Sequence, residues 1–276
     1  MRNAKSAKWL LFLIALAVLA GYTDLPSHFA HEAQKEEIFP VEQIIDGDTI
    51  RVPDKRGRSR LIRLEGIDCP EIMRHDSPGD PFSKEATELL SKLLKSKTVR
   101  ARFGAERYDR YGRLLAFVFS GDLNVNREIV KAGLATVIEL GQQDPVLMKE
   151  LLNAQKTAMR NREGIWSGDG NFNQLRSNER FVVAQSKVAR MEGKRIVIMA
   201  KITGSARKRG GTVILKTDGG VEIVIFGGSA ANFSHFGIAP RSHYTGKTVR
   251  IVGRASMYRG APNIIVRHPM SISVQE

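Results

Sequence analysis

A stretch rich in Gly, Asn and Ser, residues 167–178, separates two long β-rich segments of this chain. This composition is typical of a linker, because it offers few apolar side chains to a core. The chain has 276 residues, and domains usually run about 100 to 200 residues. The division therefore favours two moderate domains over one large domain.

Charge is distributed unevenly across this division. Residues 21–176 hold 24 basic and 24 acidic side chains, whereas residues 177–276 hold 16 basic and 5 acidic ones. Most of the net charge of +14 thus belongs to the C-terminal third, which indicates a polyanionic partner such as nucleic acid or an anionic membrane. With 42% hydrophobic and 26% charged residues, the chain is neither disordered nor a multi-span membrane protein.

The N-terminus resembles an export signal. Three basic residues precede an apolar run at residues 9–20, which is short for a membrane span of about 20 residues. We expect residues 1–20 to be a signal peptide or an N-terminal anchor, and residues 21–38 to be a polar tether. The body is expected to be periplasmic or secreted, with membrane contact through residues 9–22 if the leader is not cleaved.

Apolar periodicity in the first half predicts five strands and three helices. The expected strands are residues 41–45, 49–52, 60–64, 99–103 and 113–119, and the expected helices are residues 81–96, 126–132 and 145–160. This order is typical of a five-stranded Greek-key barrel of the OB type with added helices. We assign residues 39–166 to this domain.

The second half predicts another barrel of the same kind. Strands are expected at residues 195–203, 212–216, 221–226, 248–255 and 263–266, with a non-strand segment at residues 229–244. The fold class is therefore mainly β with α, built from two OB-like barrels. We assign residues 167–190 to the linker and residues 191–276 to the second, basic domain.

Acidic and basic side chains suited to phosphate chemistry lie near turns of the first domain. Asp48 follows the turn Asp46-Gly47, and Asp68 and Glu71 lie in a loop, while Arg63 and Arg113 lie on expected strands. Carboxylates at turns suit a hard cation, and guanidinium groups suit phosphate oxygens. The combination indicates hydrolysis of phosphodiester bonds.

These motifs together resemble the staphylococcal nuclease (thermonuclease) family between residues 40 and 166. The resemblance rests on DGDT at 46–49, RLEGIDCPE at 63–71, DRYGRLLAFVF at 109–119, VNREIVKAGLA at 125–135 and GIW at 164–166. It implies an OB-fold nuclease that cleaves the 5′ P–O bond of DNA or RNA. By the same resemblance, Asp48, Asp68 and the Cys69 backbone carbonyl bind Ca²⁺, Glu71 is the general base, and Arg63 and Arg113 hold the phosphate.

Three positions depart from the family pattern. Cys69 replaces a threonine, which matters little where the expected metal ligand is a main-chain oxygen. Glu139 and Gly141 stand where the family carries a pair of tyrosines that contact the nucleotide. Cys69 is also the single cysteine of the chain, so an internal disulfide framework is excluded.

The second domain resembles a nucleic-acid-binding OB-fold. Arg207, Lys208 and Arg209 are expected in the loop after its first strand, and Arg254, Tyr258 and Arg259 around the loop between its last two strands. OB-folds bind oligonucleotides through such loops, with arginines on phosphates and an aromatic ring under a base. Every candidate catalytic residue precedes Ser177, so the sequence predicts that cleavage survives removal of this domain.

Two other functions remain open at this stage. The chain could be a non-catalytic, extracytoplasmic nucleic-acid-binding protein, as in relatives that have lost the acids and arginines. It could also be a membrane-associated scaffold that uses the leader and the basic domain. All five family positions are present here, which favours the nuclease.

Overall fold

The structure is a computed structural model that describes residues 36–94, 98–138, 143–167 and 181–275. The expected leader, nearly all of the expected tether, and Glu139 and Gly141 lie outside these ranges. Within the described ranges, no helix is long and apolar enough to cross a membrane.

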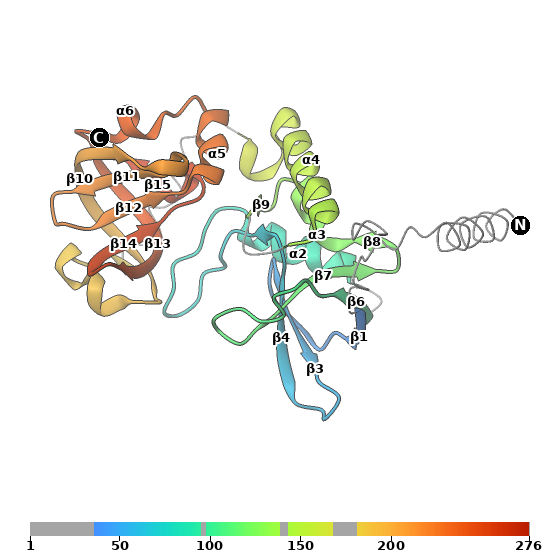
Figure 1. The fold of residues 1–276 in the computed structure, drawn as a ribbon. Coiled ribbons are helices and arrows are strands. Elements are labelled where there is room, and N and C mark those ends of the chain that lie inside the picture. The colour runs from blue at the N-terminus through green and yellow to red at the C-terminus, as the bar shows by residue number, and fades with distance from the viewer. Residues whose placement is uncertain (1–35, 95–97, 139–142, 168–180, 276) are drawn as a thin grey trace, which may run out of the picture. The chain divides into compact units, whose positions relative to one another are not determined.

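The first half of the chain forms a barrel, and Figure 1 labels most of its strands. A seven-stranded sheet has the order β1-β6-β7-β4-β3-β2, with β8 beside β7, and β5 pairs separately with β9. These strands are β1 (Glu36–Pro40), β2 (Gln43–Asp46), β3 (Thr49–Pro53), β4 (Ser59–Leu64), β5 (Ile67–Asp68), β6 (Thr98–Arg102), β7 (Leu114–Ser120), β8 (Leu123–Asn124) and β9 (Thr136–Val137).

Strand β1 closes this first barrel. It pairs antiparallel with β6, while β2 pairs with β3, and two residues, Val41 and Glu42, join β1 to β2. β1 and β2 are therefore the two halves of one interrupted strand. The expected tether at residues 21–38 is wrong at its end, because residues 36–38 belong to β1, where Phe39 is buried and Ile38 is exposed.

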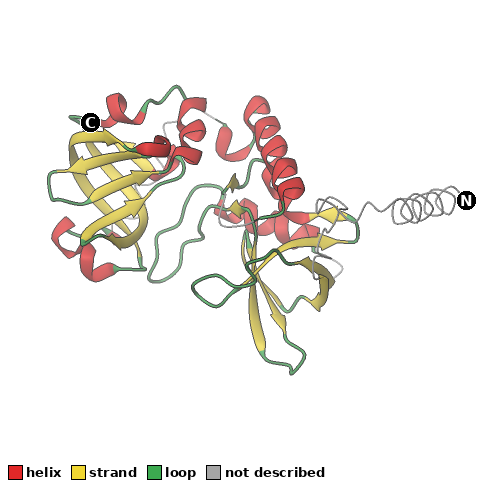
Figure 2. Cartoon of the chain, in the orientation of Figure 1, coloured by secondary structure: helices red, strands yellow, loops and turns green. Residues whose placement is uncertain are grey.

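Three helices accompany the first barrel (Figure 2). They are α2 (Ser83–Leu93), α3 (Val125–Lys131) and α4 (Pro145–Asn161), each close to its expected range. Asn124 caps α3 and Asp144 caps α4, each accepting backbone hydrogen bonds through its side chain. After α3, Gly133 has a φ of 68°, and its carbonyl accepts a hydrogen bond from Ile165 of the short 3-10 helix η2 (Gly164–Trp166).

The second half of the chain forms a six-stranded sheet, five strands of which close into a barrel, with β15 outside the ring. Its sheet order is β10-β11-β12-β14-β13-β15, and β10 also pairs with β13, which completes the ring. The elements are β10 (Arg195–Arg207), β11 (Val213–Thr217), β12 (Glu222–Ile225), α5 (Ala230–His235), α6 (Pro240–Tyr244), β13 (Thr248–Tyr258), β14 (Ala261–Ile265) and β15 (Ile272–Val274), with the 3-10 helices η4 (Gln185–Met191), η5 (Arg209–Gly211), η6 (Gly227–Ser229) and η7 (Pro269–Ser271).

Both barrels share one strand order. The third and fifth strands of each run parallel, as β4 with β7 and β12 with β14, whereas their neighbouring pairs are antiparallel. Separate clusters of buried apolar side chains fill the two barrels. The predicted fold class, mainly β with α and built from two OB-like barrels, is confirmed.

The second barrel differs from expectation in its strand lengths. β10 runs on to Arg207, and β13 runs on to Tyr258, so that Arg207 and Tyr258 lie on strands rather than in loops, while Arg254 lies on a strand as its expected range 248–255 has it. A two-residue turn, Arg259-Gly260, joins β13 to β14, and both residues have positive φ, as a tight hairpin turn requires. Strand β15 is not expected from the sequence.

The expected linker also contains ordered structure. Helix η4 (Gln185–Met191) begins inside the expected linker, residues 167–190, and buries Val188 in the core of the second barrel. Trp166, at the end of η2, is fully buried and packs in one cluster with Ile165 and Met270. The barrels belong to one compact unit, in which Trp166 is a packing contact between them.

Candidate functional site

A tight turn between β2 and β3 holds Asp48 inside the protein. Gly47 in this turn has no room for a side chain, because a Cβ atom would lie 2.7 Å from Ala86 Cβ and 3.0 Å from Cys69 Cβ. Asp48 Oδ2 accepts a hydrogen bond from the Cys69 backbone N–H (2.7 Å), and Oδ1 accepts one from the Thr49 hydroxyl (3.1 Å). Packing and hydrogen bonds thus fix the carboxylate against the Asp68-Cys69 segment.

Arg63, on β4, bridges two of the predicted metal ligands. Its Nη1 lies 2.7 Å from Asp48 Oδ2, and its Nη2 donates to Asp68 Oδ1 at 2.8 Å. The side chain of Arg63 is 11% exposed. The structure therefore brings together Asp48, Arg63 and Asp68, which the sequence placed in three different elements.

Burial affects the ionisation of Asp48. Loss of hydration raises the pKa of its carboxyl group; the Arg63 guanidinium opposes this shift, and the carboxylates of Asp46 and Asp68 add to it. Asp46 is paired with Arg74 (3.2 Å). Three carboxylates thus share one region with two arginines, and their mutual repulsion makes the region receptive to a further positive charge.

Glu71 lies in the loop that follows β5. Its backbone N–H donates to Asp80 Oδ2 (3.0 Å), and its carbonyl accepts from the Asp80 backbone N–H (2.8 Å). Burial raises the pKa of the Glu71 carboxyl group, with Arg195 acting in the opposite direction. The carboxylate Oε1 lies 3.8 Å from Arg254 Nη2, so the proposed base faces an arginine of the second barrel.

Of the other predicted site residues of the first barrel, Arg113 does not join the acid cluster and Cys69 offers no reactive thiol. Arg113 is paired with Asp109 of its own turn, with Nε 2.7 Å from Oδ2, rather than with the three clustered aspartates. Cys69 is a free, buried cysteine, and burial raises the pKa of its thiol, as expected for a residue that is not a nucleophile. Among the described residues, no group of three or more His, Cys, Asp and Glu has the geometry of a ready metal site.

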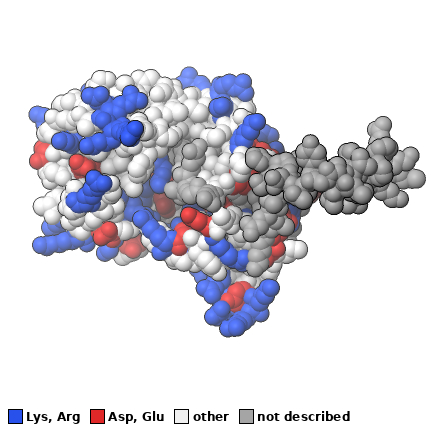
Figure 3. All heavy atoms as spheres, in the orientation of Figure 1, with Lys and Arg blue, Asp and Glu red and all other residues white. Residues whose placement is uncertain are grey.

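The predicted nucleic-acid-binding residues lie at two places on the second barrel. Arg207 ends β10, Lys208 follows it, and Arg209 begins η5. Tyr258 is 63% exposed at the end of β13, and the Arg259 guanidinium lies 5.3 Å from its ring centre. Figure 3 shows Lys and Arg side chains gathered over this barrel and also at the tip of the β3–β4 hairpin.

Sequence reasoning missed two arginines near the acids. Arg267, after β14, has its Nη1 3.4 Å from Asp68 Oδ2, and the Arg195 guanidinium is paired with Asp80. They stand more than 100 positions from their partners, at separations of 199 and 115 residues. No local pattern could have identified them, because the pairings depend on how the two barrels pack.

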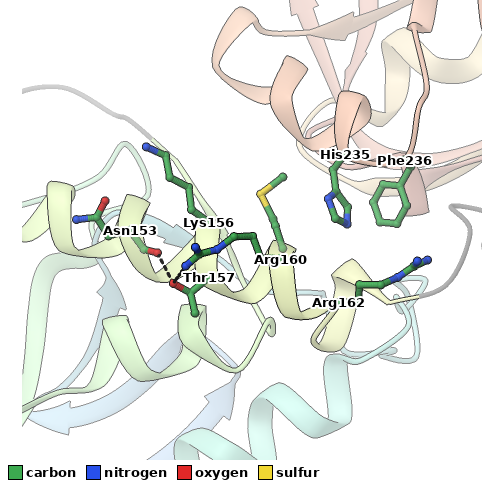
Figure 4. A pocket seen from close by; sticks show the side chains of 8 residues that line it. Asn153, Lys156, Thr157, Arg160, Arg162, His235 and Phe236 are labelled. Carbon is green, nitrogen blue, oxygen red and sulfur yellow. Dashed lines mark hydrogen bonds between the residues drawn. The ribbon is translucent and has the colours of Figure 1, made fainter.

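A separate hollow of about 950 Å³ lies beside α4. Figure 4 shows its lining, with Thr157 donating to the Asn153 carbonyl (3.1 Å) and Arg160 donating to Thr157 (3.3 Å). The lining consists of Asn153, Lys156, Thr157, Met159, Arg160, Arg162, His235 and Phe236. It includes none of the candidate catalytic residues, so the acid cluster and this hollow are distinct.

In this OB-type barrel, Arg63 of β4 holds Asp48 and Asp68 together. Carboxylates beside an arginine are groups suited to a protein that acts on phosphates. The family described as Staphylococcal nuclease homologue matches residues 61–168. The chain is 35% identical to a thermonuclease of Staphylococcus hyicus over 132 residues, covering 48% of this chain and 77% of that protein. It is 36% identical to a thermonuclease of Staphylococcus intermedius over 132 residues, covering 47% and 76%.

A third relative is an uncharacterized endonuclease of Escherichia coli, 38% identical over 128 residues, covering 46% of this chain and 75% of that protein. This chain belongs to the staphylococcal nuclease family. The predicted family and the predicted enzyme class, a nuclease, are thereby confirmed. The second barrel lies outside the region that the family model matches.

Proposed function

We propose that this protein is an exported, Ca²⁺-dependent nuclease that hydrolyses phosphodiester bonds of DNA, RNA or both, and that its second barrel retains the substrate. The observation that carries the proposal is the Arg63 bridge between Asp48 and Asp68, in a chain of this family. Glu71, three residues after Asp68, supplies a carboxylate in the same loop.

The residues present fit a hard divalent cation. Asp48 and Asp68 offer carboxylate oxygens, and Cys69 adds a backbone carbonyl in the same segment. Burial and the neighbouring carboxylates raise the pKa of Asp48, which a bound cation would offset. When bound, Ca²⁺ supplies positive charge that offsets negative charge building up on the phosphoryl oxygens.

In this mechanism Glu71 orients a water molecule and takes its proton. The water oxygen forms a bond to phosphorus, the bond from phosphorus to the 5′ oxygen breaks, and the leaving oxygen takes a proton from solvent. Arg63 and Arg113 hold the phosphate: Arg63 exchanges contacts with Asp48 and Asp68, and Arg113 its contact with Asp109, for contacts with the substrate. Losing one such preorganised donor typically costs about 10²- to 10³-fold in rate.

Retention of substrate is assigned to exposed basic residues of the second barrel. Arg207, Lys208 and Arg209 offer phosphate contacts, and Tyr258 with Arg259 offers an exposed ring beside a guanidinium. The surplus of basic residues in residues 177–276 supports this assignment. Such binding is expected to weaken steeply with salt, because it releases counterions from the nucleic acid.

Export is supported by the basic and apolar pattern of residues 1–20. Expression of the full chain, followed by cell fractionation and N-terminal sequencing, tests this part of the proposal. A mature N-terminus near Gly21 in the periplasm or medium would establish cleavage. An intact N-terminus in the membrane fraction would instead establish an anchor, and an intact N-terminus in the cytoplasm would contradict export.

Digestion of nucleic acid tests the activity and its metal. Purified full-length protein is incubated with plasmid DNA and with ribosomal RNA in Ca²⁺, in Mg²⁺ and in excess EGTA. We expect cleavage in Ca²⁺ and its loss in EGTA. Unchanged cleavage in EGTA would contradict the metal assignment, and binding of either substrate without cleavage would support a non-catalytic binding protein instead.

A further inference from the structure

Three arginines of the second barrel lie against acids of the first. Arg195 begins β10, Arg254 lies directly opposite it on β13, and Arg267 follows β14. Like charges opposite each other on neighbouring strands are destabilising unless anions compensate them. Here Asp80 compensates Arg195, and Glu71 compensates Arg254. Asp68 lies beside the third arginine, Arg267.

The contact of Arg195 is tight and buried. Its guanidinium pairs with the Asp80 carboxylate, and its Nε donates to the Pro78 carbonyl (3.2 Å). The Asp80 side chain also accepts from the Glu71 backbone N–H (3.0 Å). Through Asp80, Arg195 therefore fastens the loop that carries Glu71 to the second barrel.

The contacts of Arg254 and Arg267 are longer and more open. Arg254 Nη2 lies 3.8 Å from Glu71 Oε1, and Arg267 Nη1 lies 3.4 Å from Asp68 Oδ2. Their side chains are 45% and 32% exposed, against 11% for Arg63. Unlike Arg63, both arginines thus present donors to solvent beside the carboxylates that the proposed reaction uses.

A guanidinium group in this position matches a phosphate group in charge and geometry, because its parallel N–H donors can bind two phosphate oxygens at once. A nucleic-acid strand whose scissile phosphate lies at Asp68 and Glu71 has its neighbouring phosphates one nucleotide away on either side, beside the same loop. Arg254 and Arg267 are the groups of the second barrel that stand there. Arg207, Lys208 and Arg209, in contrast, form no ion pair with these acids in the described part of the chain.

We propose that the nuclease site is shared between the two barrels, and that Arg254 and Arg267 bind phosphates of the substrate strand next to the scissile bond. This inference rests on the proposed nuclease function and deepens it, since it assigns Arg254 and Arg267 to the site where cleavage takes place. The second barrel then takes part in binding even very short substrates. Distant retention of long nucleic acid is a separate property of the same barrel.

The test measures binding and cleavage of a six-nucleotide DNA. Arg254→Gln and Arg267→Gln are compared with Arg241→Gln, which removes an exposed arginine of α6 in the same barrel. Binding is measured by fluorescence anisotropy in EGTA, where the proposed reaction is stopped, and kcat and KM are measured separately in Ca²⁺. Circular dichroism and thermal unfolding establish that each variant is folded.

Each of the two site variants is expected to weaken six-nucleotide binding about tenfold or more and to raise KM, since a charge-assisted hydrogen bond is lost. Each should also lower the slope of log affinity against log salt by about 0.7. Arg241→Gln should change neither quantity by more than about twofold. Arg254→Lys and Arg267→Lys keep the charge but lack the paired donors, so they should retain the salt slope and still weaken binding, which lets their affinity decide if a glutamine variant does not fold.

The inference would be overturned if Arg254→Gln and Arg267→Gln both had the affinity and salt slope of Arg241→Gln. The two arginines would then serve only to link the barrels. Cleavage by the wild-type protein is scored separately. A wild-type protein that binds the six-nucleotide DNA but cuts no nucleic acid would contradict the proposed function, while the binding data would still decide the role of the two arginines.

Discussion

The guanidinium of Arg267, in the second barrel, lies 3.4 Å from the carboxylate of Asp68, in the first. This contact changes what removal of the second barrel means. The sequence predicts that a protein ending at Ser177 still cleaves, because every residue then taken as catalytic precedes that point. Such a truncation would remove Arg267 and would also expose the buried Trp166, which packs with Met270. Point variants are therefore the sharper tests.

Retention by the exposed basic residues predicts a change in salt dependence. Replacing Arg207, Lys208 and Arg209 together by alanine should weaken binding of a long DNA duplex and lower its salt slope by up to about 2 to 3, since each phosphate contact contributes roughly 0.7 to 0.9. Affinity is measured at several salt concentrations in EGTA.

The control for this triple variant is Arg241→Ala, which should leave the salt slope nearly unchanged. Cleavage of the six-nucleotide DNA should be the same in the triple variant and the wild type. An unaltered affinity and slope for the long duplex would assign the basic surface to membrane or envelope contacts instead.

The close approach of Gly133 to η2 predicts a large loss of stability on substitution. Gly133→Ala places a Cβ atom 2.1 Å from the Glu163 carbonyl oxygen, in addition to the strain of an alanine at a φ of 68°. Gly121→Ala carries a similar strain at a φ of 58° but meets no atom within 4 Å. In urea unfolding, Gly133→Ala should be about 1 to 3 kcal/mol less stable than Gly121→Ala. Equal stabilities would show that the turn relaxes freely.

His268 predicts a dependence of stability on pH. Burial lowers the pKa of its ring to about 3, with His235 adding to the shift, while Nδ1 accepts a hydrogen bond from the Met270 N–H (3.1 Å). Between pH 6.5 and about 3, the unfolded chain binds a proton here that the folded chain does not. Stability from this group therefore falls as pH falls, by about 1.4 kcal/mol per pH unit.

The free energy of unfolding at pH 6.5 and pH 5 measures this contribution. His268→Asn should lower stability at pH 6.5, and its difference from the wild type should shrink by roughly 2 kcal/mol at pH 5. His75→Asn, at an exposed position, is the control and should show no such change. If the difference in unfolding free energy between the wild type and His268→Asn were the same at both pH values, a neutral, buried His268 would be contradicted.

How far the sequence predicts the structure depends on how local each signal is. The turn at Asp46-Gly47-Asp48 and the helices were recognisable because their patterns lie within a few residues. Strand β1 was missed because Glu36 and Glu37 read as part of a polar segment and Pro40 ends the strand after one buried residue, Phe39. Its place depends on pairing with β6, which lies about 60 residues away.

The candidate site shows the same limit. Asp48, Asp68 and Arg63 were identified from their motifs, and the structure joins them through one guanidinium. Arg254 lay on the strand expected at residues 248–255 and was assigned to nucleic-acid binding around the loop that follows, but its pairing with Glu71 was not expected. No sequence motif indicated a role for Arg267, because only the packing of one barrel against the other brings it to Asp68.

The central claim is that this chain cleaves phosphodiester bonds with Glu71 as the base. The most direct measurement compares turnover of a short DNA by wild-type protein, Glu71→Gln and the exposed control Glu88→Gln, in Ca²⁺, together with their affinities for that DNA in EGTA. Glu71→Gln should lower kcat by about 10²-fold or more with affinity nearly unchanged, and Glu88→Gln should match the wild type. Near-normal turnover in Glu71→Gln would contradict the account.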